Sequence, residues 1–311
     1  MAYELAVIND GIREDPEKFV RECEGEYGRR LGEAVERIRG NMGKSPIVLL
    51  SGPSGSGKTT TAKRICDELE RGGITAHTVS LDHYFLTVDP NTTPRTPSGA
   101  YDFESPLCLD MDLINAHFAA LARGDEIKIP YFRFSTQSRS NSKFTSMRLN
   151  GNEIAIFEGI HALNDSITGA HPDAFRLYIS ARSDVTANGG TCFKGTWLRL
   201  IRRAVRDSFF RNTDAQGTLA MWANVRRGEK LHISPFKDSA HCRLDTSMPY
   251  EISALKGYAT AVFEHVPDGA ERFDELRRIL PALTLFADID PALIPTDSIL
   301  REFIGGGKYE Y

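Results

Sequence analysis

A run of small residues that ends in a lysine and a threonine carries the clearest chemistry in this chain of 311 residues. Residues 52–59 read Gly-Pro-Ser-Gly-Ser-Gly-Lys-Thr and match the pattern G-x-x-x-x-G-K-[ST]. Glycines at these spacings let the backbone curl, so that successive N–H groups point at phosphate oxygens. Lys58 would neutralise the β- and γ-phosphates, and the hydroxyl of Thr59 would bind Mg²⁺. We therefore expect ATP and Mg²⁺ as cofactors, held by Gly52, Ser54, Gly55, Ser56, Gly57, Lys58, Thr59 and Thr60.

Two carboxylates follow apolar or β-like stretches and could act beside this loop. Asp82 comes after residues 78–81 and could accept the proton of an attacking hydroxyl group. Glu158 ends the apolar run 154–157 and could hold Mg²⁺, directly or through water. The alternatives are an aspartate that caps a turn and a glutamate that forms a salt bridge at the end of a strand.

Arginines recur at helical spacing further along the chain. Arg199, Arg202, Arg203 and Arg206 fall on one helix face, opposite a face of apolar residues. Arginine offers fixed, forked donors and stays ionised, so such a stripe could close over a triphosphate and offset charge on the transferring group. A solvated helix face is the alternative.

The elements needed to position these residues are visible as apolar runs. Residues 47–50 predict a buried parallel strand, and the apolar face of residues 62–69 predicts the helix after the loop. Further strands are expected at 155–157 and 175–179. The pattern predicts an α/β fold with a parallel sheet flanked by helices. Two stretches rich in small, polar or turn-forming residues, 89–99 and 183–195, predict loops.

Three segments are expected along the chain. Residues 1–44 would form a helical N-terminal extension, residues 45–260 the phosphate-loop domain, and residues 261–311 a helical C-terminal extension packed on that domain. Amphipathic patterns in both extensions indicate packing rather than chemistry.

Composition narrows the function classes. The formal net charge of −4 argues against general affinity for nucleic acid, because that affinity depends on an excess of lysine and arginine. The five cysteines are scattered without a C-x-x-C pair, which indicates a reducing compartment rather than disulfides or zinc. No run approaches the roughly 18 apolar residues that a membrane span needs. We expect a cytoplasmic protein without a membrane or nucleic-acid partner. The sequence leaves open whether the chain forms a homo-oligomer.

Several motifs occur in an order that resembles the uridine kinase and phosphoribulokinase family of P-loop kinases, and its bacterial uridine kinase-like branch. They are the loop itself, 80–85 (SLDHYF), 101–106 (YDFESP), 129–131 (IPY), 157–163 (FEGIHAL), 202–207 (RRAVRD) and 294–306 (IPTDSILREFIGG). The resemblance implies a P-loop fold in which Asp82 is the general base and Phe85 and Glu104 lie beside the acceptor. It also implies a lid that carries Arg203, Arg206 and Arg211. Glu104 has a rationale of its own, since a carboxylate can accept from two ribose hydroxyls.

The acceptor is where this sequence departs from the family. Animal-type uridine-cytidine kinases carry a tyrosine and a histidine where Phe132 and Gln137 align. Gln137 could still bond a base edge and Phe132 could stack on a ring. Arg133 and Arg139 could instead favour an acceptor that already carries phosphate.

The resulting hypothesis is a nucleoside 5′-kinase for uridine or cytidine, in which Asp82, Lys58 and Arg206 are catalytic. The expected acceptor contacts are Asp82, Phe85, Glu104, Phe132, Gln137 and Arg139. A kinase for a phosphosugar or a pantothenate-like alcohol is one alternative. The other is a nucleotide-dependent regulator, which is disfavoured because no guanine-reading N-K-x-D or T-K-x-D run occurs.

Overall fold

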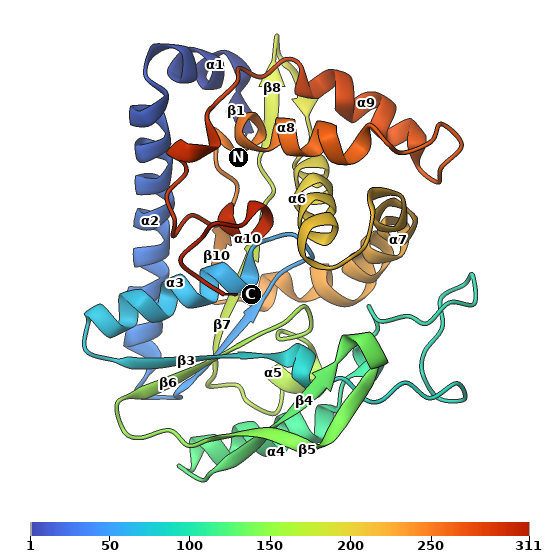
Figure 1. The fold of residues 1–311 in the computed structure, drawn as a ribbon. Coiled ribbons are helices and arrows are strands. Elements are labelled where there is room, and N and C mark those ends of the chain that lie inside the picture. Colours follow the sequence, from blue (N-terminus) through green and yellow to red (C-terminus); the bar gives the residue numbers. More distant parts are fainter. Residues whose placement is uncertain (1, 311) are drawn as a thin grey trace.

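The computed structural model describes residues 2–310, and a five-stranded parallel sheet lies at its centre (Figure 1). The spatial order of the strands is β10-β7-β2-β6-β3. Every pair of neighbours is parallel, which confirms the fold class predicted from the sequence. The strands are β2 (Ile47–Ser51), β3 (Thr75–Ser80), β6 (Glu153–Glu158), β7 (Phe175–Ser180) and β10 (Cys242–Asp245).

Side chains of the central strand divide between two hydrophobic clusters, one on each face of the sheet. Ile47 and Leu49 belong to one cluster, and Val48 and Leu50 belong to the other. All five residues of β2 are buried, because both faces of a parallel sheet are covered by other elements. On one face lie α2 (Pro16–Asn41), α3 (Lys58–Arg71), α6 (Gly195–Phe210), α7 (Ala215–Gly228) and α8 (Glu251–Phe263); on the other lie α4 (Met111–Ala122) and α5 (Asp165–Thr168).

The segments near the two ends of the described chain share the cluster that also packs on α3. Ile8 in α1 (Leu5–Glu14) and Leu276 in α9 (Phe273–Leu283) are buried in it, as is Leu300 just before α10 (Arg301–Ile304). Asn9 ties the two segments together, since its Nδ2 donates to Leu285 O at 2.8 Å and its Oδ1 accepts from Ala287 N at 2.7 Å. The segments near the two ends of the described chain are therefore packed in one cluster and bonded to each other.

One stretch predicted as a loop is a β-hairpin. Within residues 183–195, β8 (Asp184–Ala187) and β9 (Gly190–Phe193) pair in antiparallel fashion, and β1 (Ala2–Glu4) adds to β8 in parallel. The turn is Asn188-Gly189, with positive φ at both residues (53° and 78°). This dipeptide is the common choice for a two-residue hairpin turn, so the loop prediction was wrong and the signal was present.

A second hairpin stands beside the lower part of the sheet (Figure 1). It is formed by β4 (Ile127–Arg133) and β5 (Ser138–Met147), which pair in antiparallel fashion with an irregularity between Pro130 and Phe132. In the described part of the chain, no helix combines the length and the apolar character that crossing a membrane requires.

The fold contains a fully buried ion pair whose removal should be costly. Arg202 in α6 and Glu251 in α8 are both 0% exposed and meet through two contacts, one of them Nη2 to Oε2 at 2.7 Å. Replacing Glu251 by alanine leaves a buried guanidinium without its counter-charge. We expect Glu251→Ala to lower the free energy of unfolding by about 3–5 kcal/mol, measured by urea denaturation.

The matched control is Glu22→Ala, because Glu22 pairs with Lys18 at 3.9 Å on an exposed helix face. This variant should change the unfolding free energy by less than about 0.5 kcal/mol. Equal small effects of the two variants would contradict the assignment of a structural role to the buried pair.

Candidate active site

The loop between β2 and α3 has the backbone shape that a phosphate cradle needs. Gly55 and Gly57 have φ values of +73° and +78°, a region that side chains with a Cβ rarely adopt. A Cβ on Gly55 would also lie 2.8 Å from the carbonyl oxygen of Arg199. The loop therefore depends on glycine both for its backbone conformation and for its close approach to α6.

Side chains from two other segments hold the carbonyl groups of this loop. Arg199 Nε donates to Ser54 O at 3.0 Å, and Arg202 Nη1 donates to Gly55 O at 3.1 Å. Thr246 Oγ1, just after β10, donates to Ser56 O at 2.7 Å. Because these carbonyls are bonded to the surrounding protein, the peptide planes of the loop are fixed before any ligand arrives.

Arg199 and Arg202 thus differ from the other residues of the predicted basic stripe. Arg199 is 2% exposed, and its two terminal nitrogens donate to the carboxylate of Glu229 at 3.0 and 2.7 Å. Arg202 is paired with Glu251 in the same way. Both guanidinium groups are thus bonded to loop carbonyls and to buried carboxylates, so these two arginines support the backbone of the loop.

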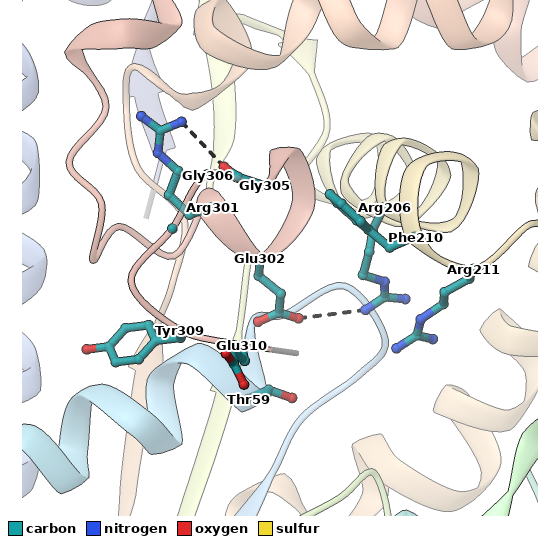
Figure 2. A pocket seen from close by; sticks show the side chains of 11 residues that line it. Thr59, Arg206, Phe210, Arg211, Arg301, Glu302, Gly305, Gly306, Tyr309 and Glu310 are labelled. Carbon is teal, nitrogen blue, oxygen red and sulfur yellow. Dashed lines mark hydrogen bonds and ion pairs between the residues drawn. The ribbon is translucent and has the colours of Figure 1, made fainter.

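Three further arginines gather around one buried aspartate. Asp207 lies 3.2 Å from Arg203 Nε, 3.1 Å from Arg206 Nη2 and 3.8 Å from Arg211 Nε. Arg203 also donates from Nη1 to Ser54 Oγ at 2.8 Å, which places it at the loop. Figure 2 shows Arg206 and Arg211 pointing toward the same cavity as Thr59.

The carboxyl ends of β2, β3 and β6 bring the predicted acids close to the loop. Ser80 of β3 is the register partner of Glu158 of β6, and Asp82 is the second residue after Ser80. Thr59 Oγ1 donates to Glu158 Oε1 at 3.4 Å, and Lys58 Nζ donates to Pro53 O at 3.2 Å. Burial raises the pKa of Glu158 to about 7, and the charge of Asp82 adds to this rise while Lys58 opposes it. Burial also lowers the pKa of Lys58.

The pair Thr59 and Glu158 fits a magnesium ion that is shared with phosphates. Their oxygens are adjacent, and Mg²⁺ prefers oxygen ligands supplied by one or two protein groups together with nucleotide phosphates and water. Among residues 2–310, no group of three or more His, Cys, Asp or Glu side chains is arranged to hold a metal by itself. The protein would therefore supply only part of the coordination.

Glu104, predicted to bind the acceptor, packs against the end of α7. A Cβ on Gly228 would lie 2.3 Å from the Cβ of Glu104, so α7 packs directly on this side chain. Burial raises the pKa of Glu104 to about 7, while Arg203 and Lys58 oppose the rise. The neighbouring Asp102 forms an ion pair with Arg227 of α7, which anchors the segment that carries Glu104.

The other predicted acceptor residues are more dispersed. Phe85 and Phe132 are buried and pack against each other, with ring centroids 5.5 Å apart. Gln137 is exposed at the tip of the β4–β5 hairpin, and its carbonyl accepts from Val88 N. Arg139 donates to Asp110 Oδ2 at 2.8 Å and to Tyr84 O at 2.9 Å, so its guanidinium already has partners.

His161 lies near the site and received no role from the sequence. It is 1% exposed, and neither ring nitrogen has a hydrogen-bond partner among the described residues. Burial and the neighbouring His232 lower its pKa to about 4, so the imidazole is neutral at pH 7. The signal available beforehand was its place shortly after Glu158, in the segment 157–163.

Comparison with known proteins places this geometry in a family. Residues 47–253 match the model of the phosphoribulokinase / uridine kinase family. The uridine kinase of Schizosaccharomyces pombe is 30% identical over 198 residues, which cover 62% of this chain and 39% of that protein. The uridine kinase of Macrococcus caseolyticus is 27% identical over 186 residues, which cover 60% and 80%. The chain thus spans less than half of the yeast relative.

Among solved structures, the D-glycerate 3-kinase of Cryptococcus neoformans is similar with a TM-score of 0.32 and 16% identity. The similarity covers 85% of this chain and 89% of that one.

The raised pKa of Glu158 predicts a pH-dependent contribution to stability. Between the ordinary value of 4.5 and about 7, the folded protein holds a proton that the unfolded chain has released. Glu158 therefore lowers the free energy of unfolding as pH rises through this window. We expect Glu158→Gln, relative to the parent, to become about 1–3 kcal/mol more stable between pH 5 and pH 8, measured by urea denaturation at each pH.

The exposed Glu126 provides the control for this measurement. The difference between Glu126→Gln and the parent should stay constant over the same pH range. Glu104 has a similarly raised pKa but is present in all three proteins, so its contribution cancels. Parallel stability curves for Glu158→Gln and the parent would show that Glu158 titrates normally.

Proposed function

The chain belongs to the phosphoribulokinase / uridine kinase family, and on that basis we propose that it transfers the γ-phosphoryl group of ATP to a hydroxyl group of a small metabolite. The acceptor that we propose is a nucleoside, uridine or cytidine, phosphorylated at its 5′-hydroxyl. The observation that carries the proposal is the convergence of Asp82, Glu158 and Lys58 where neighbouring strands end beside the phosphate loop. A loop that only bound a nucleotide would have no use for an acid at the position of Asp82.

In this reaction the side chain of Asp82 orients the acceptor hydroxyl and takes its proton as the oxygen attacks phosphorus. Lys58 lies within the electrostatic influence of Asp82 and Glu158, and its ammonium group offsets the charge that develops on the phosphoryl oxygens. Arg206, which shares Asp207 with Arg203, adds a second cation.

Thr59 and Glu158 would hold Mg²⁺, which when bound neutralises phosphate charge and keeps the phosphates in line. Burial alone favours the protonated form of Glu158. The cation would shift the protonation equilibrium toward the ionised form. In the free protein this carboxyl group is therefore partly protonated near pH 7.

Two observations support a nucleoside over an acceptor that already carries phosphate. Glu104 is partly buried within the electrostatic influence of Lys58 and could accept two hydrogen bonds from the cis hydroxyls of a ribose. Arg139, one of the two arginines that could have bound an acceptor phosphate, is committed to Asp110 and Tyr84. We also propose a cytoplasmic location, since all five cysteines are free thiols in the structure.

The acceptor is tested by following ADP release from ATP with a panel of alcohols. We expect uridine and cytidine to stimulate release, and ribulose 5-phosphate, pantothenate and glycerate to fail. Deoxyuridine should be a poorer substrate, because a ribose site built on Glu104 rejects an analogue that lacks a hydroxyl group. Stimulation by only one of the other alcohols would identify that alcohol as the acceptor and leave the assignment of kinase activity unchanged.

The role of Asp82 is tested by Asp82→Asn, which removes the base but preserves the size of the side chain. We expect kcat to fall by at least about 10²-fold, with the Kd for ADP, measured by calorimetry, unchanged within twofold. Asp112→Asn changes an exposed aspartate near the start of α4 and should retain full turnover. Undiminished turnover by Asp82→Asn would remove this residue from the mechanism.

A further inference from the structure

The short helix α10 lies beside the first turn of α3 and places an acid on it. Glu302 Oε2 accepts a hydrogen bond from Thr60 N at 3.2 Å and another from Thr60 Oγ1 at 2.7 Å. Glu302 is 6% exposed and Thr60 is fully buried, so the contact is shielded from water. The two residues are 242 positions apart in the chain, and Glu302 lies outside the segment that matches the family model.

The donors that Glu302 occupies belong to the phosphate cradle. Thr60 directly follows Lys58 and Thr59, and the backbone N–H groups at this first helical turn are the ones that such a loop offers to phosphate oxygens. The turn also carries the positive end of the helix dipole, which favours any nearby anion. A carboxylate placed here has the charge and the acceptor oxygens of the ligand itself.

The same carboxylate also engages a cation of the site. Arg206 Nη1 lies 3.7 Å from Glu302 Oε1, and Figure 2 shows this contact at the edge of the cavity. Glu302 acts on Lys58 as well, since its charge opposes the lowering of the Lys58 pKa. Three groups expected to bind a nucleotide, Thr60, Arg206 and Lys58, are thus under the influence of one acid from the C-terminal segment.

Space for a ligand adjoins this contact. A cavity of about 450 Å³ opens beside Glu302, and its lining includes Thr59, Arg206, Arg211 and the glycine backbone of residues 305–307. The backbone that carries Glu302 is anchored independently of its carboxylate. Ile299 packs where a Cβ of Gly57 would be, and the buried Phe303 lies under the guanidinium of Arg202 at 5.0 Å. The side chain of Glu302 can therefore turn into the cavity while α10 stays in place.

We propose that the carboxylate of Glu302 competes with the nucleotide for binding groups of the phosphate cradle, an inference that rests on the proposed function. Its carboxylate holds the Thr60 donors and the Arg206 cation that a nucleotide phosphate requires, and it leaves them when the phosphate binds. Nucleotide affinity is then lower than the cradle alone would give. When ADP dissociates, Glu302 returns to Thr60, so the exchange favours release of the product.

The test compares ADP binding by calorimetry in the full chain, Glu302→Gln and Glu302→Ala. Glutamine keeps the shape but removes the charge, and alanine removes the competing acceptor altogether. We expect both variants to bind ADP about tenfold more tightly than the parent, because hydrogen bonds to a charged group are the ones being displaced. Adenosine, which has no phosphate, should bind equally to all three proteins.

Asp297→Asn is the matched control, since it removes the same charge from the same segment and Asp297 does not line the cavity. Its Kd for ADP should stay within twofold of the parent. Without nucleotide, Glu302→Ala should unfold at a lower temperature than the parent, and ADP should raise that temperature more in the variant than in the parent.

Unchanged or weaker ADP binding in both Glu302 variants, with the parent binding normally, would overturn the competition and make Glu302 a support of the nucleotide site. An equal gain in Asp297→Asn would overturn it too, because the effect would then be one of net charge. Failure of every protein, the parent included, to bind ADP would instead refute the nucleotide site on which the proposed function rests.

Discussion

The active-site loop of this protein depends on hydrogen bonds that reach its carbonyl oxygens from behind. Arg199, Arg202 and Thr246 hold three successive carbonyls, and the two arginines are themselves neutralised by Glu229 and Glu251. An unpaired buried guanidinium would be too costly, so the loop, its arginines and their acids form one interdependent unit. This unit also constrains the positions of α6, α7 and α8. Each of these helices supplies, or lies next to, one of its arginines or acids.

The interior of the site concentrates charges whose ionisation is disfavoured by burial. Glu104 and Glu158 both have a pKa near 7, and the pKa of Lys58 is lowered. A carboxyl group with a raised pKa gains from the arrival of a cation, since the cation supplies the missing counter-charge in a medium that screens poorly. Burial of these groups therefore lowers the stability of the protein, and a ligand that supplied the counter-charge would restore it.

The sequence predicted the parts of this site that are encoded locally. Gly52 to Thr59, the apolar strand before it and the amphipathic helix after it lie within one short stretch, and the motif needs nothing else to be recognised. The Asn188-Gly189 turn is equally local, but the small and polar residues around it favour a loop by composition.

The contacts that could not be predicted join residues distant in the chain. Nothing beside Arg199 or Arg202 indicates that Glu229 or Glu251 will neutralise it, and a charged helix face gives the same pattern whether it is solvated or buried. Likewise, nothing near Asp102 indicates Arg227, and nothing near Glu302 indicates Thr60. A single sequence carries no record of such pairings, because they arise only when the helices pack.

The bond between Asn9 and the segment 285–287 has a consequence for how the protein is made. During synthesis, α1 and the strand before it emerge early, but their polar partner leaves the ribosome only after the whole sheet has been translated. The central sheet can assemble as its strands appear, whereas the outer layer that joins both ends closes last, and the phosphate cradle receives its final neighbour in the same step.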